Sequence, residues 1–189
     1  YNLPQGISFP ESFWEEVVKI YRVTLKDGKE REVSIFWADG DLVFTSVTKG
    51  DEKYVISNHQ ISVKYQLHPT RKSYYRKEIY LDGKIYKRFD VYYKDVPKNV
   101  SIYFLFNLHS HPKVGDFYPF LSLQDVKSQL TSNAIVSGLI TDKLWLVVRT
   151  DKTPKEILLT QEEVSVDNLR TKMEMVCYCA NLNGKAIRQ

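Results

Sequence analysis

The sequence contains little histidine or cysteine and no long apolar segment. Of 189 residues, four are histidine and two are cysteine. No apolar run approaches the ~18 residues of a membrane-spanning helix, so we expect no membrane partner. The two cysteines, Cys177 and Cys179, are too close in sequence for an ordinary long-loop disulfide, and no secretory leader is visible. Both features favour a reducing, cytoplasmic setting.

The composition is that of a soluble globular protein of ordinary size. Hydrophobic residues make up 43% of the chain and charged residues 26%, which is typical of such proteins. A chain of 189 residues can bury its own core, and the sequence shows no internal repeat. We therefore predict one domain spanning residues 1–189. The net charge of +4 is too small to indicate a nucleic-acid partner by itself.

Two of the four histidines lie two positions apart, in the segment His109-Ser110-His111-Pro112. Residues 101–108 before them are aromatic and aliphatic and predict a buried strand. On a strand, positions i and i+2 point to the same face, so both imidazoles would lean toward one point. A catalytic zinc ion takes three protein ligands, with nitrogen at about 2.0–2.1 Å, and leaves its fourth position to water. The pair could supply two of those ligands.

A third ligand is available in the segment Ser122-Leu123-Gln124-Asp125, which has the pattern of a helix start. Ser122 is the expected N-cap, and an apolar stripe follows it. In the first turn the helix dipole favours an ionised carboxylate by up to about 1 kcal/mol, which suits Asp125 as a metal ligand. Ser-x-x-Asp alone is also an ordinary capping arrangement, and a histidine pair alone is often structural. Their joint occurrence favours a metal site.

The segment His109-Ser-His-Pro followed by Ser122-x-x-Asp125 resembles the motif of the JAMM (MPN-plus) metalloproteases. Residues 134–149 are similar to the strand pair that follows the motif helix in that fold. Members of this family hydrolyse isopeptide or peptide bonds at the C-terminus of ubiquitin or ubiquitin-like proteins. They bind zinc through two histidines and one aspartate and use an upstream glutamate as general base. The resemblance implies that His109, His111 and Asp125 hold zinc.

The N-terminal part of the chain predicts a helix followed by a hairpin. The helix begins near Pro10 and ends at Asp27-Gly28, because proline favours a helix start and glycine a helix end. Residues 32–38 and 42–47 read as two strands joined by a turn at Asp39-Gly40.

The resemblance places the general base at the start of the first hairpin strand. Glu32 stands there and is the candidate base. Glu30 is its rival, and a solvated charge beside two basic neighbours is the alternative for either residue. The hydroxyl of Ser122 is expected to donate a hydrogen bond to the oxyanion of the tetrahedral intermediate.

Residues from about 71 to 98 predict a long, tyrosine-rich hairpin with its turn at Asp82-Gly83. This segment has nine basic and four acidic residues, a balance of about +5. An amphipathic hairpin with a packed tyrosine face and a solvated basic face would explain the pattern. Two functional alternatives are nucleic-acid binding, by phosphate pairing and base stacking, and capture of the extended tail of an acidic ubiquitin-like protein.

A final helix is predicted from about Gln161 or Asp167 to Asn181, with Gly184 as its stop. Four apolar residues keep the spacing of one packed helical face: Leu169, Met173, Val176 and Ala180.

Together these patterns predict an α+β fold, with a mixed, curved sheet packed by the N-terminal, motif and C-terminal helices. The expected function is that of a zinc-dependent metallo-isopeptidase acting on the C-terminal tail of ubiquitin or a ubiquitin-like protein. His109, His111 and Asp125 would hold the metal, with Glu32 and Ser122 as catalytic residues. A non-catalytic scaffold of the same fold and a nucleic-acid-binding module are the two alternatives.

Overall fold

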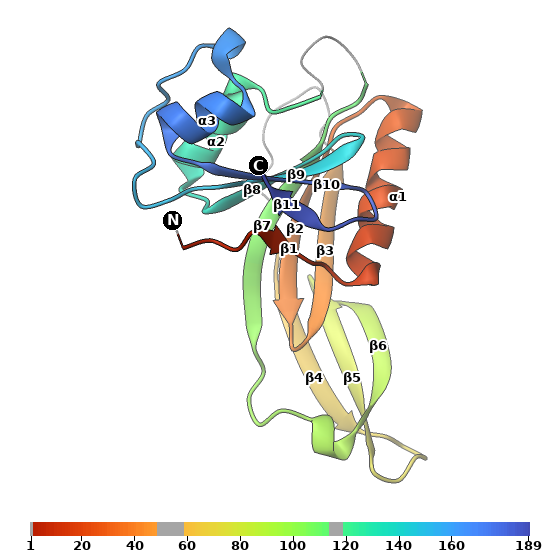
Figure 1. The fold of residues 1–189 in the computed structure, drawn as a ribbon. Coiled ribbons are helices and arrows are strands. Elements are labelled where there is room, and N and C mark those ends of the chain that lie inside the picture. The colour runs from red at the N-terminus through yellow and green to blue at the C-terminus, as the bar shows by residue number, and fades with distance from the viewer. Residues whose placement is uncertain (1, 49–58, 114–118) are drawn as a thin grey trace. The chain divides into compact units, whose positions relative to one another are not determined.

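The computed structural model describes residues 2–48, 59–113 and 119–189. These residues form three α-helices, two short 3-10 helices and two β-sheets (Figure 1). The α-helices are α1 (Glu11–Asp27), α2 (Leu123–Ser132) and α3 (Val166–Met173), and the 3-10 helices are Tyr93–Asp95 and Gln161–Glu163. The strands are β1 (Gly6–Ile7), β2 (Arg31–Ala38), β3 (Asp41–Thr48), β4 (Ile61–Leu67), β5 (Tyr74–Leu81), β6 (Lys84–Tyr92), β7 (Ile102–Ser110), β8 (Val136–Ile140), β9 (Lys143–Val148), β10 (Val176–Asn181) and β11 (Ala186–Arg188).

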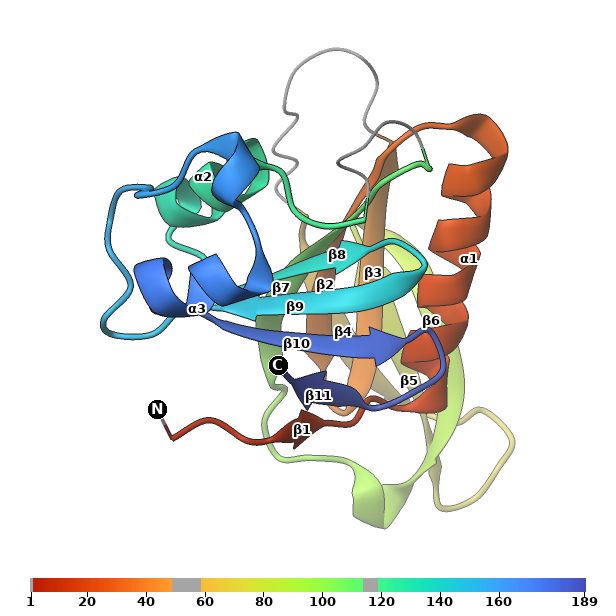
Figure 2. The same cartoon turned by 45° about the horizontal axis from the view of Figure 1, so that its top comes forward.

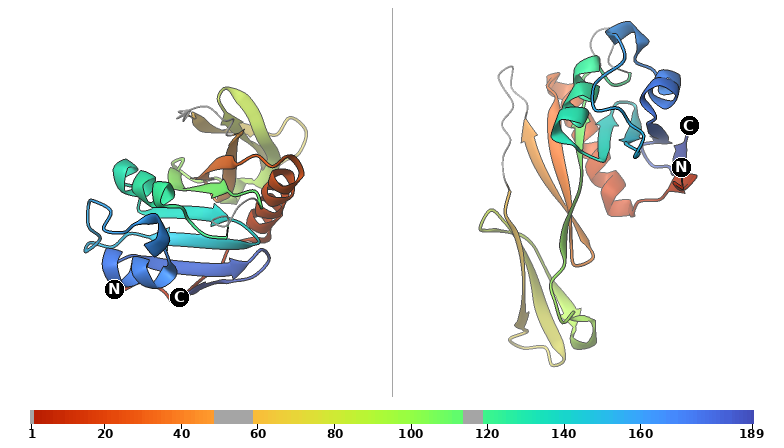
Figure 3. Two further views of the ribbon diagram at one scale, coloured as in Figure 1. Left: turned by 90° about the horizontal axis from the view of Figure 1, so that it is seen from above. Right: turned by 90° about the vertical axis from the view of Figure 1, so that its left-hand side faces the viewer.

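The larger sheet is mixed and strongly curled, as predicted. Its strand order is β1-β11-β10-β9-β8-β7-β2-β3, and the smaller sheet has the order β4-β5-β6. β7 pairs with β8 in parallel, whereas β8, β9, β10 and β11 pair in antiparallel fashion. β1 pairs with β11, so the first and last strands form one edge of the sheet (Figure 3). The coarse α+β prediction is confirmed. Among the described residues, no helix is both long enough and apolar enough to cross a membrane.

The chain groups into two compact units. Unit 1 takes in the described residues within 1–34, 46–53 and 106–189, and unit 2 those within 35–45 and 54–105. The metal-ligand candidates all belong to unit 1, and the tyrosine-rich hairpin belongs to unit 2. The prediction of a single domain over residues 1–189 stays a prediction.

In unit 1, α1 forms as the sequence predicted. Its buried residues Phe13, Val17, Ile20 and Thr24 recur at helical spacing. Gly28 ends the helix in the left-handed conformation, with φ 68°, and its N–H bonds to the carbonyl of Thr24. α2 and α3 lie together, away from α1 (Figure 2). They pack on β8, β9 and β10 around a core that includes Leu139, Val147, Leu169, Met173 and Cys177.

Gly138 on β8 leaves room for the side chain of Leu108 on β7. A Cβ atom on Gly138 would lie 2.1 Å from Cδ2 of Leu108, a separation that real atoms do not reach. The side chain of Leu108 lies over this glycine, in the register that sets His109 opposite Leu139. The strand that carries the first histidine is therefore held by close packing.

The prediction of a buried strand for residues 101–108 is right only in part. Phe106 and Leu108 are buried, but residues 102–105 are 36–59% exposed. β8 pairs with β7 only at residues 107–110. The pairing with β8 is therefore confined to the second half of β7.

The predicted C-terminal helix is wrong beyond Met173. α3 ends there, because Glu174 takes the left-handed conformation, and Val176–Asn181 form β10 between β9 and β11. Val176 and Ala180 are buried, as a packed helical face would require, but they lie on this strand. Cys177 and Tyr178 are buried too, so apolar residues cover both faces of β10. A strand buried on both faces shows no alternation, and it resembles a buried helix segment in sequence.

Unit 2 contains the predicted hairpin. β5 and β6 pair in antiparallel fashion around Asp82-Gly83, where both residues have positive φ. The inner face of the smaller sheet packs on the β2–β3 hairpin around Ala38, Val43, Val63 and Ile79, with Tyr65 and Phe89 partly buried beside them.

Candidate metal centre

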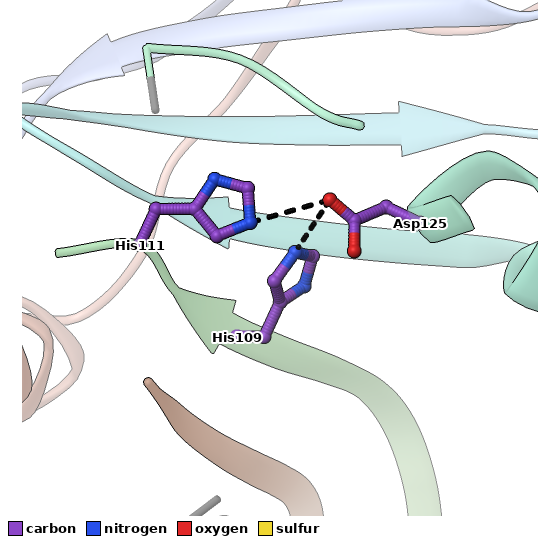
Figure 4. Close-up of side chains that lie close together, drawn as sticks. All are labelled: His109, His111 and Asp125. Carbon is purple, nitrogen blue, oxygen red and sulfur yellow. Dashed lines mark ion pairs between the residues drawn. The ribbon is translucent and has the colours of Figure 1, made fainter. Parts of the chain in front are cut away.

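Three predicted ligands come together in unit 1. His109 and His111 at the end of β7 and Asp125 in the first turn of α2 offer ligand atoms that all lie within 4.8 Å of one another (Figure 4). The Nε2 atoms of both histidines lie 3.2 Å from Oδ2 of Asp125. The three side chains are 12%, 9% and 16% exposed, so solvent screens them only weakly.

The strand geometry of β7 aims the two histidines. Phe106, Leu108 and Ser110 face the buried side of the strand, so His109 points to the other side. The backbone N–H of His111 still bonds to the carbonyl of Ile140 on β8, at 3.0 Å, which continues the parallel register past the end of the strand. The two imidazole rings meet edge to face, with centroids 4.9 Å apart.

The capping box that the sequence also allowed is present at the start of α2. Oγ of Ser122 accepts a hydrogen bond from the backbone N–H of Asp125, at 3.2 Å, and Oδ2 of Asp125 accepts one from the N–H of Ser122, at 2.9 Å. The N–H of Leu123 donates to Oε1 of Gln161 at 2.9 Å. The cap fixes the carboxylate of Asp125 where the histidines can reach it, so the capping and ligand roles are compatible.

The electrostatics of the cluster keep Asp125 ionised. Burial opposes the charged form, but the close contacts with His109 and His111 and the N–H of Ser122 outweigh it. They hold the pKa of Asp125 well below its usual range. An ionised carboxylate is the form that binds a metal ion.

The donor set fits zinc. Ligands at about 2.0–2.1 Å in a tetrahedron lie about 3.3–3.4 Å from one another, close to the two separations of 3.2 Å. Nε2 of His109 is buried and, among the described residues, has no hydrogen-bond partner, so its contact with Asp125 is not aligned as a hydrogen bond. A buried nitrogen in this state is costly unless it binds something else. Two imidazole nitrogens and one carboxylate oxygen are typical zinc ligands.

Two hydrogen bonds define how β2 lies beside β7. The backbone N–H of Arg31 donates to Oγ of Ser110 at 2.9 Å, and Oγ of Ser34 donates to Oδ1 of Asn107 at 2.8 Å. From Arg31 to Ser34 the partner on β7 moves back from Ser110 to Asn107. The two strands therefore run antiparallel in this region.

This register sets the two candidate bases beside different histidines. Continued by one residue in each direction, it places Glu32 beside His109 and Glu30 beside His111. Oε1 of Glu30 lies 3.8 Å from Nε2 of His111. The structure thus brings the rival residue to the cluster, and the role predicted for Glu32 stays a prediction.

The loop before β2 is tied down at both ends. The guanidinium of Arg31 forms a fork with the carboxylate of Asp27 and also donates to the carbonyl of Lys29, at 2.9 Å. The hydrogen bonds from Arg31 and from the N–H of Lys29 lower the pKa of Asp27 to about 2. Glu30 therefore sits between two anchored neighbours.

Ten residues lie between His111 and Ser122, about three more than the JAMM motif usually has, and this spacing predicts a bulge in the loop if Asp125 is to reach the metal. Residues 114–118 of that loop lie outside the part of the chain that the structure describes. Its ends place His111 and Asp125 together nonetheless.

No family model, no curated protein and no solved structure matches the chain. The interpretation of the cluster therefore rests on its residues and their geometry.

Proposed function

We propose that the protein is a zinc-dependent metallo-isopeptidase that hydrolyses the amide bond at the C-terminal tail of ubiquitin or a ubiquitin-like protein. One observation carries the proposal: His109 and His111 converge with Asp125, which lies 14 positions after His111 in the sequence. Both Nε2 atoms are 3.2 Å from the same carboxylate oxygen. The choice of substrate rests on the resemblance of the motif to the JAMM metalloproteases.

A bound zinc ion would polarise the amide carbonyl and lower the pKa of its water from about 15.7 toward 7. The chain's own residues would handle the protons. Glu30, whose carboxylate lies 3.8 Å from Nε2 of His111, would take a proton from the attacking water and return it to the leaving amine. Glu32, the base that the resemblance predicts, is the alternative for this role.

Ser122 can serve as cap and oxyanion donor together. In the capping box its oxygen accepts the N–H of Asp125, which leaves the hydroxyl hydrogen available. That hydrogen can be donated to the oxyanion that forms during hydrolysis.

The two alternatives gain less support. A scaffold has no need for a buried histidine nitrogen that forms no aligned hydrogen bond with any described residue. On the hairpin of unit 2, Glu78 pairs with Arg88 and Asp90 with Arg71, both at 2.7 Å. These pairs neutralise two of the basic charges that binding to nucleic-acid phosphates would use, so the hairpin carries no second proposal.

Removal of the metal tests the proposal. We expect about one zinc per chain and cleavage of ubiquitin joined through its C-terminal glycine to a fluorescent amine. A chelator should abolish cleavage and zinc should restore it, while circular dichroism shows the fold retained, because a domain of this size has its own core. Cleavage that persists in the metal-free protein, or a wild type that takes up no zinc, would contradict the proposed chemistry. Zinc uptake with cleavage of short peptide amides alone would contradict only the substrate.

Replacement of the cap residue gives a second test. Ser122→Ala should lower the rate about 10²–10³-fold, as expected for the loss of one oxyanion donor, and destabilise the protein by about 1 kcal/mol through the lost cap. Ser165 is a matched control, because its side chain caps α3 in the same way by accepting the N–H of Asn168. Ser165→Ala should show the same loss of stability with the rate unchanged. Equal rates for the two variants would remove Ser122 from catalysis.

A further inference from the structure

A chain of buried hydrogen bonds joins α1, β7 and β2 behind the candidate metal centre. Oγ of Ser110 lies 2.6 Å from Oγ1 of Thr24 and 2.9 Å from the backbone nitrogen of Arg31. Thr24 and Ser110 are fully buried, and Arg31 is 9% exposed. Ser110 stands between the two histidines in sequence, and Arg31 directly follows Glu30.

The direction of each bond in this chain can be deduced. A hydroxyl has one hydrogen to donate, and Thr24 gives its hydrogen to the carbonyl of Ile20, at 2.8 Å. Thr24 must therefore accept from Ser110. Since Ser110 uses its hydrogen there, its oxygen is left to accept the N–H of Arg31. The sequence of donors thus runs from Arg31 through Ser110 and Thr24 to Ile20, without an alternative.

We infer that Thr24 and Ser110 are positioning residues, which set the distance between the carboxylate of Glu30 and His111; this inference rests on the proposed function. Ser110 lies between the two histidine ligands in the sequence, and its hydroxyl bonds to Thr24. The same hydroxyl oxygen accepts the N–H of Arg31, the first residue of β2. The start of β2 is thereby locked to the strand that carries the metal ligands. Thr24 anchors the pair to α1. The catalytic carboxylate is held through the backbone that follows it.

This role differs from simple satisfaction of buried polar groups. If the hydrogen bonds served only stability, their loss would lower the melting temperature and leave the turnover of the folded protein unchanged. If they position Glu30, turnover falls while metal and substrate still bind, because a displacement of about 1 Å can cost about 10²-fold in rate.

Thr24 offers a matched pair of variants. Thr24→Val keeps the shape of the side chain and removes the hydroxyl, so that Ser110 loses its acceptor; Thr24→Ser keeps the hydroxyl and removes a methyl group. Well below the melting temperature we expect Thr24→Val to lower kcat about 10–100-fold. KM for the ubiquitin amide and the affinity for zinc should stay within about 3-fold of wild type, and Thr24→Ser should retain wild-type kcat within the same margin. Hydrogen exchange at the amide of Arg31 should quicken in the valine variant only.

A double-mutant cycle assigns the effect to Glu30. If Thr24→Val acts by displacing that carboxylate, Glu30→Gln should cost clearly less in the valine variant than in wild type. Unchanged kcat in Thr24→Val, an equal loss in Thr24→Ser, or full additivity with Glu30→Gln would overturn the inference while the zinc chemistry stands. A wild type that neither binds zinc nor cleaves would overturn the proposed function and this inference with it.

Discussion

His109→Ala, His111→Ala and Asp125→Ala are each expected to lose the zinc ion and to reduce hydrolysis to background. Each change removes one of three protein ligands, and two ligands hold zinc poorly. The loss of affinity should exceed the roughly 10–100-fold that follows removal of a group that only orients a ligand. Elemental analysis after zinc reconstitution and gel filtration measures the metal content. Thermal unfolding establishes that each variant is folded.

Two further variants serve as controls for this experiment. His59→Ala also removes an imidazole, but one that bonds to Asp82 in unit 2, so zinc content should be unchanged. Asp125→Asn keeps a side-chain oxygen that can accept the N–H of Ser122 while removing the charge, and it should lose zinc with α2 still capped. Metal content equal to wild type in all three alanine variants would show that the cluster is not the zinc site.

The local elements were predictable because their signals are local. α1 has its apolar spacing and a glycine that can take the left-handed conformation at its end. Asp39-Gly40 and Asp82-Gly83 adopt positive φ in the two hairpin turns, which is what these residue types favour. Beyond Met173 the apolar residues fit a helix and a strand equally well, and only pairing with β9 and β11 decides between the two.

The same distinction between local and long-range signals applies to the candidate site. The two histidines lie within one short segment, and Ser122 and Asp125 lie within another. The pattern in each segment is local, so the convergence of the three ligands could be predicted. Glu32 lies on β2, and Glu30 lies one residue before that strand begins, so the two are only two positions apart along the chain. The choice between them depends on the register of β2 against β7. That register pairs segments distant in sequence, so no local pattern predicts it.

The supporting residues lie outside the motif altogether. Gln161 reaches the first turn of α2 from 38 residues away in sequence, and Thr24 reaches Ser110 from 86 residues away. Gln161 gives no signal in the sequence. Thr24 gives one: it occupies the buried stripe of α1 with Phe13, Val17 and Ile20, where a hydroxyl must find a partner.

Glu30→Gln is expected to keep the zinc ion and to lower hydrolysis about 10²–10⁴-fold. Gln has the shape of Glu and cannot accept the proton, so the loss measures general-base catalysis. KM should change little, because the substituted group acts on the proton in transit and does not hold the substrate. Steady-state kinetics on the ubiquitin amide, with zinc content determined on the same samples, measures both quantities.

Glu32→Gln is the matched comparison, since it makes the same chemical change two positions further along the chain, on β2. We expect it to stay within a few-fold of wild type, because among the described side chains it is the carboxylate of Glu30 that reaches the cluster, 3.8 Å from Nε2 of His111. Glu30→Asp should be intermediate, because it keeps the carboxylate and withdraws it by about one carbon–carbon bond, a displacement large enough to cost about 10²-fold. The reverse pattern, with Glu32→Gln inactive and Glu30→Gln active, would assign the base to Glu32, and the register argument for Glu30 would be wrong.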